Sequence, residues 1–265
     1  PSSLYRRPEQ LPEGGVLVVG ASASGVQLAD ELARSGREVT IAAGRHTRVP
    51  RRYRGRDIMY WLDRIGSLQR PLSDMPNPEE AKREPSLQLM GNEEGRNLDL
   101  GVLADRGVRV TGRLLGFDGC RARLGRGLHR TTAAADHQMG RLLDRIDRHI
   151  TTHGLEHEFP ASDPWSLVKP FDTPEEIDLS QSGIRSVLWA TGYRRSYPWL
   201  EAGVLDERGE VRNHRGRTPA PGLFIIGMQF MIRRNSSFID GVGRDADEIA
   251  ETIAQRAGQR TREVA

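Results

Sequence analysis

The feature that most constrains this chain is a glycine turn near its start. Residues 16–25 read Val-Leu-Val-Val-Gly-Ala-Ser-Ala-Ser-Gly, so four apolar residues run directly into the turn and a helical pattern opens behind it. Such a turn lets backbone N–H groups at a helix N-terminus close on a pyrophosphate. We therefore predict a dinucleotide-binding turn made by Gly20, Ala21, Ser22, Ala23, Ser24 and Gly25.

By itself the turn is a weak signal, because Ser22 stands where the usual fingerprint has its middle glycine, but the segments that follow it strengthen the prediction. A helix is expected from about Ala23 to Ser35, and a second strand from Glu38 to Ala43. Together they make a βαβ unit of the expected length. The sequence thus predicts an α/β fold with a Rossmann-like, doubly wound nucleotide-binding domain. A doubly wound unit that binds no dinucleotide is the alternative.

The residues after the second strand bear on which dinucleotide binds. NAD-dependent enzymes usually place Asp or Glu there for the ribose 2′-hydroxyl, whereas arginine accommodates the 2′-phosphate of NADP. Residues 43–48 contain no carboxylate but include Arg45 and Arg48. Arginine is the default cation of this chain, since all but Lys82 and Lys169 of its 39 basic residues are arginines. The missing acid is therefore the stronger half of the argument, which favours NADP.

Composition excludes several other classes of protein. The single Cys120 rules out an intramolecular disulfide and a Cys-x-x-Cys redox pair. No apolar run approaches membrane-spanning length and no signal peptide is visible, which predicts a cytoplasmic protein without membrane association. The net charge is +3, but arginines alternate with acids and aromatics make up only 6%. A nucleic-acid partner is therefore not expected.

Hydrophobic spacing predicts the remaining elements. We expect helices over 58–65, 129–153 and 244–256, and strands over 87–90, 108–110, 113–117, 184–189 and 223–226. Residues 67–86, which four prolines interrupt, and residues 157–183 are expected to be loops.

Four motifs occur in an order that resembles a known family. They are the segments 2–5 (Ser-Ser-Leu-Tyr), the glycine turn, 190–193 (Ala-Thr-Gly-Tyr) and 222–227 (Gly-Leu-Phe-Ile-Ile-Gly). The chain resembles flavin-containing monooxygenases and the bacterial FAD/NADP-dependent oxidoreductases related to them and to Baeyer–Villiger enzymes. The resemblance implies an NADP domain inserted into an FAD domain. It also implies that Ala190, Thr191 and Gly192 form the crossing beside the cofactors.

The resemblance further implies a reaction. NADPH passes a hydride to FAD, and the reduced flavin reacts with dioxygen to give a C4a-(hydro)peroxide that oxygenates a small-molecule substrate. The cofactor carries this chemistry, so we name no catalytic side chain. Two alternatives stay open: a truncated NADP-binding remnant or subunit without its own flavin, and a flavoprotein reductase that passes electrons to a partner protein.

The chain departs from the family pattern at its start, because no FAD fingerprint precedes Pro1. We expect residues 1–192 to form the NADP-binding domain and 193–265 the C-terminal segment of the FAD-type domain. Residues 241–246 satisfy Gly-x-Gly-x-x-Ala, but the better interpretation is a helix start. The chain alone is therefore expected to bind NADP(H) without stoichiometric FAD, and to self-associate or pair with another chain through its C-terminal part. His149, His153 and His157 are interpreted as a solvated helix end, not as a metal site.

Overall fold

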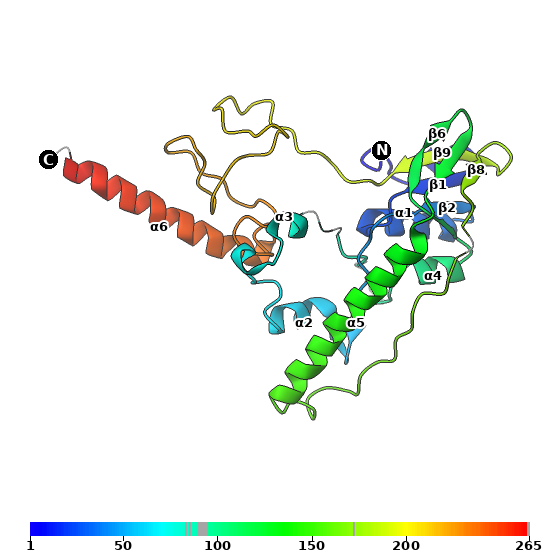
Figure 1. Cartoon of the computed structure of the whole chain (residues 1–265), viewed down its shortest axis with the longest axis horizontal. Helices are drawn as coiled ribbons and strands as arrows, with labels where there is room; N and C mark the ends of the chain where they lie inside the picture. The colour runs from blue at the N-terminus through cyan, green and yellow to red at the C-terminus, as the bar shows by residue number, and fades with distance from the viewer. Residues whose placement is uncertain (83, 85, 90–94, 172, 264–265) are drawn as a thin grey trace. The chain divides into compact units, whose positions relative to one another are not determined.

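The computed structural model describes residues 1–82, 84, 86–89, 95–171 and 173–263, with side chains described up to residue 257. It divides into two compact units. The first combines Pro1–Trp61 with Pro85–Gly192, and the second combines Leu62–Glu84 with Tyr193–Ala265. Figure 1 shows the chain with its α-helices and several of its strands labelled.

A parallel sheet of four strands forms the centre of the first unit. Its strands are β1 (Gly15–Val19), β2 (Val39–Ala42), β5 (Arg109–Thr111) and β9 (Ile184–Trp189). They lie in the order β5-β2-β1-β9, so the chain builds outward on one side of β1 and then crosses to the other. That reversal is the topological switch point at which doubly wound folds bind ligands. The predicted Rossmann-like fold is confirmed.

Helices cover one face of this sheet. All five residues of β1 are buried, and Val16 and Val18 pack on this face with Val26, Ala29 and Leu32 of α1 (Ala23–Arg34). The short helix α4 (Leu100–Asp105) adds Leu100 and Leu103 to the same cluster. The apolar spacing of α1 thus buries one stripe of the helix and leaves most of its polar residues exposed, whereas Asp30 is buried and pairs with Arg34 and Arg106.

A small antiparallel sheet covers the opposite face. It consists of β6 (Leu114–Asp118), β7 (Arg121–Leu124) and β8 (Glu176–Asp178), in the order β6-β7-β8. Leu17 and Val19 of β1 pack here against Ala122, Leu124 and Ile177. The central sheet is therefore buried on both faces, as its continuous apolar strands require.

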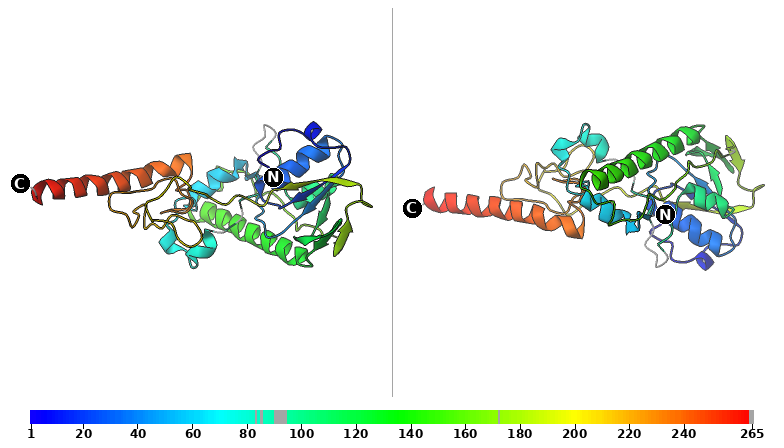
Figure 2. Two further views of the ribbon diagram at one scale, coloured as in Figure 1. Left: turned by 90° about the horizontal axis from the view of Figure 1, so that it is seen from above. Right: turned by 90° about the horizontal axis from the view of Figure 1, so that it is seen from below.

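The rest of the first unit lies around a long helix, α5 (Leu128–Thr152), which Figure 2 shows from two further sides. The two-residue strands β3 (Arg52–Tyr53) and β4 (Arg56–Asp57) form a hairpin that leads into α2 (Ile58–Arg64). Trp61 is fully buried, donates its indole N–H to the Tyr53 carbonyl at 2.7 Å and packs against the ring of Phe159. A 3₁₀ turn, η1 (Pro8–Gln10), precedes β1.

The second unit contains η2 (Leu72–Asp74), α3 (Pro78–Ala81) and α6 (Ile239–Glu263). Residues 62–84 join the C-terminal segment through backbone hydrogen bonds, from Leu72 N–H to Ile232 O and from Asn235 N–H to Leu68 O, both 2.9 Å. From the sequence, residues 62–84 are expected in the first domain, 1–192. Their contacts with the C-terminal segment join residues far apart along the chain, and such contacts leave no local sequence pattern. The assignment of the two parts to NADP and FAD domains stays a prediction.

Several predicted elements differ from the structure. Residues 87 and 224 form isolated bridges, so the predicted strands over 87–89 and 223–226 are wrong, and Met90 lies outside the described residues. The strands β7 and β8 were missed. In β7 the exposed and buried residues alternate, but the strand is only four residues long and its exposed positions are arginines. The helix predicted over 244–256 begins earlier and ends later, as α6.

Among the described residues, no helix combines the length and the apolar character needed to cross a bilayer.

The double coverage of the central sheet can be tested at Leu17, which is 1% exposed and packs against the small sheet. Leu17→Ala should lower the free energy of unfolding by about 2–5 kcal/mol, because it leaves a cavity between the sheets. Leu115→Ala is the matched control, since Leu115 is 63% exposed. Urea denaturation would measure both; a loss at Leu17 no larger than that at Leu115 would contradict the packing.

Candidate functional site

The predicted glycine turn lies at the carboxyl end of β1, between Val19 and the first residue of α1. Gly20 has φ +108°, and a Cβ there would lie 2.4 Å from the carbonyl oxygen of Ala190. A Cβ on Gly25 would lie 1.9 Å from the carbonyl oxygen of Gly20. Only glycine fits either position, so the turn, the helix and the end of β9 are in direct contact.

The first turn of α1 is suited to an anion. Ser22 is the N-cap residue with extended backbone angles, φ −81° and ψ −174°, but its side chain makes no capping hydrogen bond. No acidic residue lies in the first turn of the helix. The positive end of the helix dipole thus meets no side-chain carboxylate from this turn, which is the arrangement found where phosphates bind. Ala21 is buried, Ser22 and Ala23 are half-buried, and Ser24 is exposed.

Ala190, Thr191 and Gly192 continue from β9 beside this turn. The Ala190 N–H donates to the Val19 carbonyl at 2.8 Å, which extends the pairing of β9 with β1 as far as the turn. Ala190 is buried, whereas Thr191 and Gly192 are exposed. The structure therefore brings this predicted crossing together with the glycine turn.

The loop after β2 carries Arg45 and Arg48 in different environments. Arg45 is exposed, and buried His46 lies next to it with its Nδ1 2.9 Å from the Gly44 carbonyl oxygen. Burial lowers the pKa of His46. Its ring is therefore held uncharged near neutral pH and adds no positive charge to this loop.

Arg48 points into the protein and is held by two carboxylates. Its guanidinium pairs with Asp99 at 2.7 Å and with Asp136 at 2.5 Å, and donates to the Ser166 carbonyl at 2.9 Å. The side chain is 14% exposed. A phosphate would have to compete with both carboxylates for this arginine. The structure thus brings Arg45 and Arg48 into one loop and directs Arg48 into the buried ion cluster with Asp99 and Asp136.

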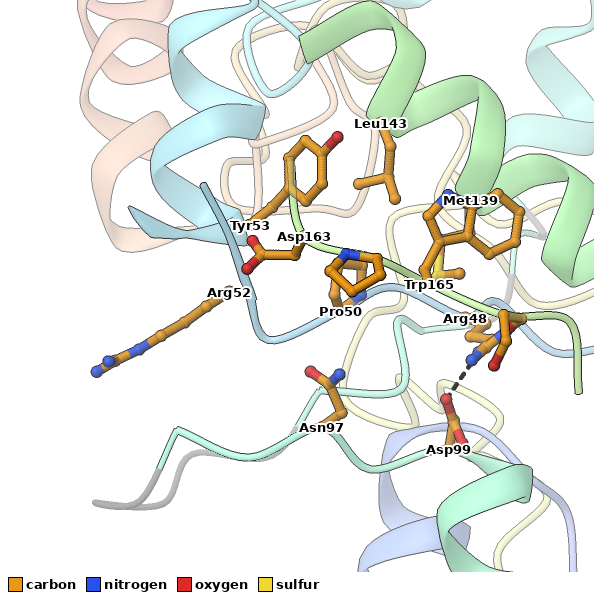
Figure 3. Close-up of a pocket in the computed structure, with 12 residues that line it drawn as sticks. Arg48, Pro50, Arg52, Tyr53, Asn97, Asp99, Met139, Leu143, Asp163 and Trp165 are labelled. Carbon is orange, nitrogen blue, oxygen red and sulfur yellow. Dashed lines mark hydrogen bonds and ion pairs between the residues drawn. The ribbon is translucent and has the colours of Figure 1, made fainter. Parts of the chain in front are cut away.

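A cavity of about 340 Å³ lies beside this cluster. In Figure 3 the dashed line joins Arg48 to Asp99, and the Arg52 side chain extends away from the cavity. Gly140, inside α5, makes room for the indole of Trp165, because a Cβ there would lie 3.1 Å from the ring. The cavity is lined by Arg48, Pro50, Arg52, Tyr53, Asn97, Asp99, Met139, Leu143, Asp163, Pro164, Trp165 and Ser166.

Two further residues of the site were missed from the sequence. Arg113 follows β5, the strand next to β2, and is exposed. The aliphatic part of its side chain lies against Gly44: its Cγ and Cδ are each 3.7 Å from the position that a Cβ of Gly44 would take. Gln88 is buried and donates its side-chain N–H to the Ala21 carbonyl at 2.7 Å. The position of Arg113 follows once β5 is placed next to β2. The only local sign that Gln88 has a special role is that this polar residue stands between two leucines.

The second unit has a cavity of its own, of about 1010 Å³, whose lining includes Arg194, Arg195, Glu210 and Met228. Residues 241–246 lie inside α6, and in the described part of this unit no β-strand precedes that helix. The strand–turn–helix needed to hold a pyrophosphate is thus absent from its described residues. By themselves they do not fit an FAD site.

Comparisons with known proteins agree with this geometry. No family model matches the chain. It is 28% identical over 254 residues to an uncharacterized CzcO-like oxidoreductase of Geobacillus kaustophilus and 24% identical over 257 residues to the uncharacterized oxidoreductase CzcO of Bacillus subtilis. Both alignments cover 95% of this chain but 56% of the relative, so the chain spans about half the length of these proteins.

Solved structures give the same answer for the fold. A flavin-containing monooxygenase from Stenotrophomonas maltophilia superposes with a TM-score of 0.52 at 14% identity, over 96% of this chain and 53% of that protein. A variant of a flavin monooxygenase from the same organism gives a TM-score of 0.51. The resemblance predicted from the motifs is confirmed: the chain is a relative of the CzcO-like oxidoreductases and has the fold of the flavin monooxygenases.

Proposed function

We propose that the first unit binds NADP(H) and delivers its hydride in a flavin-dependent oxidation of the monooxygenase type. One observation carries the proposal: a glycine turn closes on the end of β9 at the switch point of a parallel sheet and leaves the N-terminus of a 12-residue helix without a side-chain cap. In this arrangement the backbone of residues 20–25 holds the pyrophosphate.

The preference for NADP over NAD rests on the end of β2. No carboxylate lies within residues 43–48 to accept a ribose 2′-hydroxyl. Arg45 and Arg113 are exposed at the ends of the neighbouring strands β2 and β5. We assign the 2′-phosphate to these two arginines. Arg48, which the sequence also suggested for this role, is bound by Asp99 and Asp136 and would act by fixing the shape of the loop.

When bound, NADPH supplies a hydride. The residues of this chain bind the pyrophosphate, orient the adenosine end and direct the nicotinamide along the crossing at 190–192. The described residues do not complete an FAD site by themselves, because no β-strand precedes α6 in the described part of the second unit. In the proposed activity, this chain holds the flavin jointly with another part of the protein or with another chain. A monooxygenase and a reductase that passes electrons to a partner protein would both use this NADP-binding unit.

The glycine turn gives the first test of nucleotide binding. Gly20→Val should abolish NADPH binding, because the new side chain would collide with the Ala190 carbonyl and close the approach to the pyrophosphate. Gly107→Ala is the control: it also replaces a glycine with positive φ, but nothing lies within 4 Å of its Cβ position. Isothermal titration of variants that circular dichroism shows to be folded would measure this. Native affinity in a folded Gly20→Val protein would mean that the turn is structural only.

The arginines give a test of cofactor selectivity. Arg45→Ala and Arg113→Ala should each raise the Kd for NADPH about tenfold and leave the Kd for NADH nearly unchanged, since only NADPH carries the 2′-phosphate. Arg109→Ala is a matched control, because Arg109 is exposed at the opposite end of β5. Equal losses for both nucleotides would sink the assignment.

Arg48→Ala should behave differently from those variants. It leaves Asp99 and Asp136 buried without their cation, so the free energy of unfolding should fall by about 3–5 kcal/mol. Urea denaturation of this variant and of Arg45→Ala would separate the two roles. A selective loss of NADPH affinity with unchanged stability in Arg48→Ala would restore this arginine to the phosphate site.

Flavin content tests the extent of the site. Residues 1–265 alone should bind NADP(H) but purify without stoichiometric FAD, because β1, the one strand of the described parallel sheet that runs through a glycine turn directly into a helix, is assigned to NADP. Absorbance of the purified protein, together with extraction and quantification of flavin, measures this. A monodisperse yellow monomer with about one FAD per chain would overturn the assignment.

A further inference from the structure

Gln88 joins the two loops that enclose the proposed nucleotide site, one through its side chain and the other through its backbone. It is 1% exposed, and its Nε2 donates to the Ala21 carbonyl in the glycine turn at 2.7 Å. The backbone N–H of Gln88 donates to the Thr47 carbonyl, in the loop after β2, at 3.0 Å. One residue thus connects the turn to the loop that carries Arg45.

The chemistry of the contact fixes how the Gln88 amide is turned. The Ala21 carbonyl oxygen can only accept a hydrogen bond, so the nitrogen of the side-chain amide must face it. The oxygen, Oε1, then points elsewhere, and it is buried without a hydrogen-bond partner among the described residues. A buried amide that is satisfied on one side only adds little net stability, because the hydrogen bond gained at the Ala21 carbonyl is offset by the unpaired Oε1.

The same contact fixes the peptide between Ala21 and Ser22. The chain contains no cis peptide bond in its described part, and in a trans peptide the C=O and the following N–H point in opposite directions. Because the Ala21 carbonyl points to Gln88, the Ser22 N–H points away from it. If this peptide turned over, a carbonyl oxygen would take the place of that N–H and would repel a phosphate.

We propose that Gln88 is a positioning residue, which holds the 21–22 peptide in the orientation that presents the Ser22 N–H to the pyrophosphate. This inference rests on the proposed NADP site. Gln88 does not touch the nucleotide; it acts through Ala21. Its backbone bond to Thr47 keeps the loop after β2 in register with the turn.

The first variant is Gln88→Leu, measured with two ligands. The Kd for NADPH should rise about tenfold, since the turn loses the bond that orients its peptide. The thermal midpoint of unfolding should stay close to that of the wild type, because the Ala21 carbonyl loses its donor but the unpaired Oε1 is removed as well. Adenosine 2′-monophosphate, which lacks the pyrophosphate, should bind as it does to the wild type. A purely structural role would instead lower the midpoint or weaken both ligands alike.

Gln27→Leu is the matched control. The Gln27 side chain donates to the Leu89 carbonyl at 3.0 Å and therefore contacts the same segment without touching the turn. Its NADPH affinity should stay at the wild-type level.

The second variant is Gln88→Glu, studied as a function of pH. The introduced carboxyl can donate to the Ala21 carbonyl while it is protonated but not after it ionises, and burial raises the pKa of such a group. The NADPH affinity of this variant should therefore be near wild type at low pH and should fall as the pH rises, relative to the wild type at each pH. An affinity ratio that does not change with pH would contradict the proposed contact.

The outcomes separate this inference from the function on which it rests. If the wild type binds no NADPH, the proposed function fails. If the wild type binds NADPH and Gln88→Leu binds it equally well, the site stands and the role of Gln88 is overturned. If Gln88→Leu does not fold, the pH series of Gln88→Glu decides.

Discussion

The closure of Ala190 on Gly20 is the constraint on which the site depends. A Cβ at position 20 would lie 2.4 Å from the Ala190 carbonyl oxygen, and one at position 25 would lie 1.9 Å from the Gly20 carbonyl oxygen. The two glycines thus let β1, α1 and the end of β9 meet without side chains between them. The helix N-terminus consequently lies at the carboxyl edge of the sheet, the place where doubly wound folds bind phosphates.

A buried ion cluster fixes the shape of the neighbouring loop. Arg48 comes from the segment after β2, Asp99 caps α4 by accepting the Val102 N–H, and Asp136 lies on α5. Their side chains are 14%, 8% and 3% exposed. Removing one member would leave buried charge uncompensated, so the three elements are held to one another. The cluster makes Arg48 part of the frame of the site and leaves Arg45 and Arg113 on its surface.

The central βαβ unit could be predicted from the sequence because its determinants are local. Strand β1, the turn and α1 follow one another within residues 15–34, and the spacing of their apolar residues and glycines indicates the strand, the turn and the helix. The resemblance to flavin monooxygenases followed from ordered motifs in the same way. The partners of Arg48 could not be predicted, since Asp99 and Asp136 lie 51 and 88 residues away along the chain.

The same reason explains the other differences. Gln88 lies in an apolar run that reads as a strand, and only the folded chain shows that its amide reaches Ala21, 67 residues away. Residues 62–84 contact the C-terminal segment through bonds such as that between Arg234 and Glu84, which local periodicity cannot reveal. Two strands of the small sheet were missed because β7 and β8 are only four and three residues long. Local pattern thus predicts elements, whereas the charges of the site are arranged by long-range contacts.

The most direct test of the central claim compares the affinities of residues 1–265 for NADPH and NADH by isothermal titration at one salt concentration. We expect a one-to-one complex with NADPH and a Kd for NADH at least about tenfold higher, because only NADPH offers a 2′-phosphate to the arginines. Equal affinities, or no binding of either nucleotide by folded protein, would contradict it.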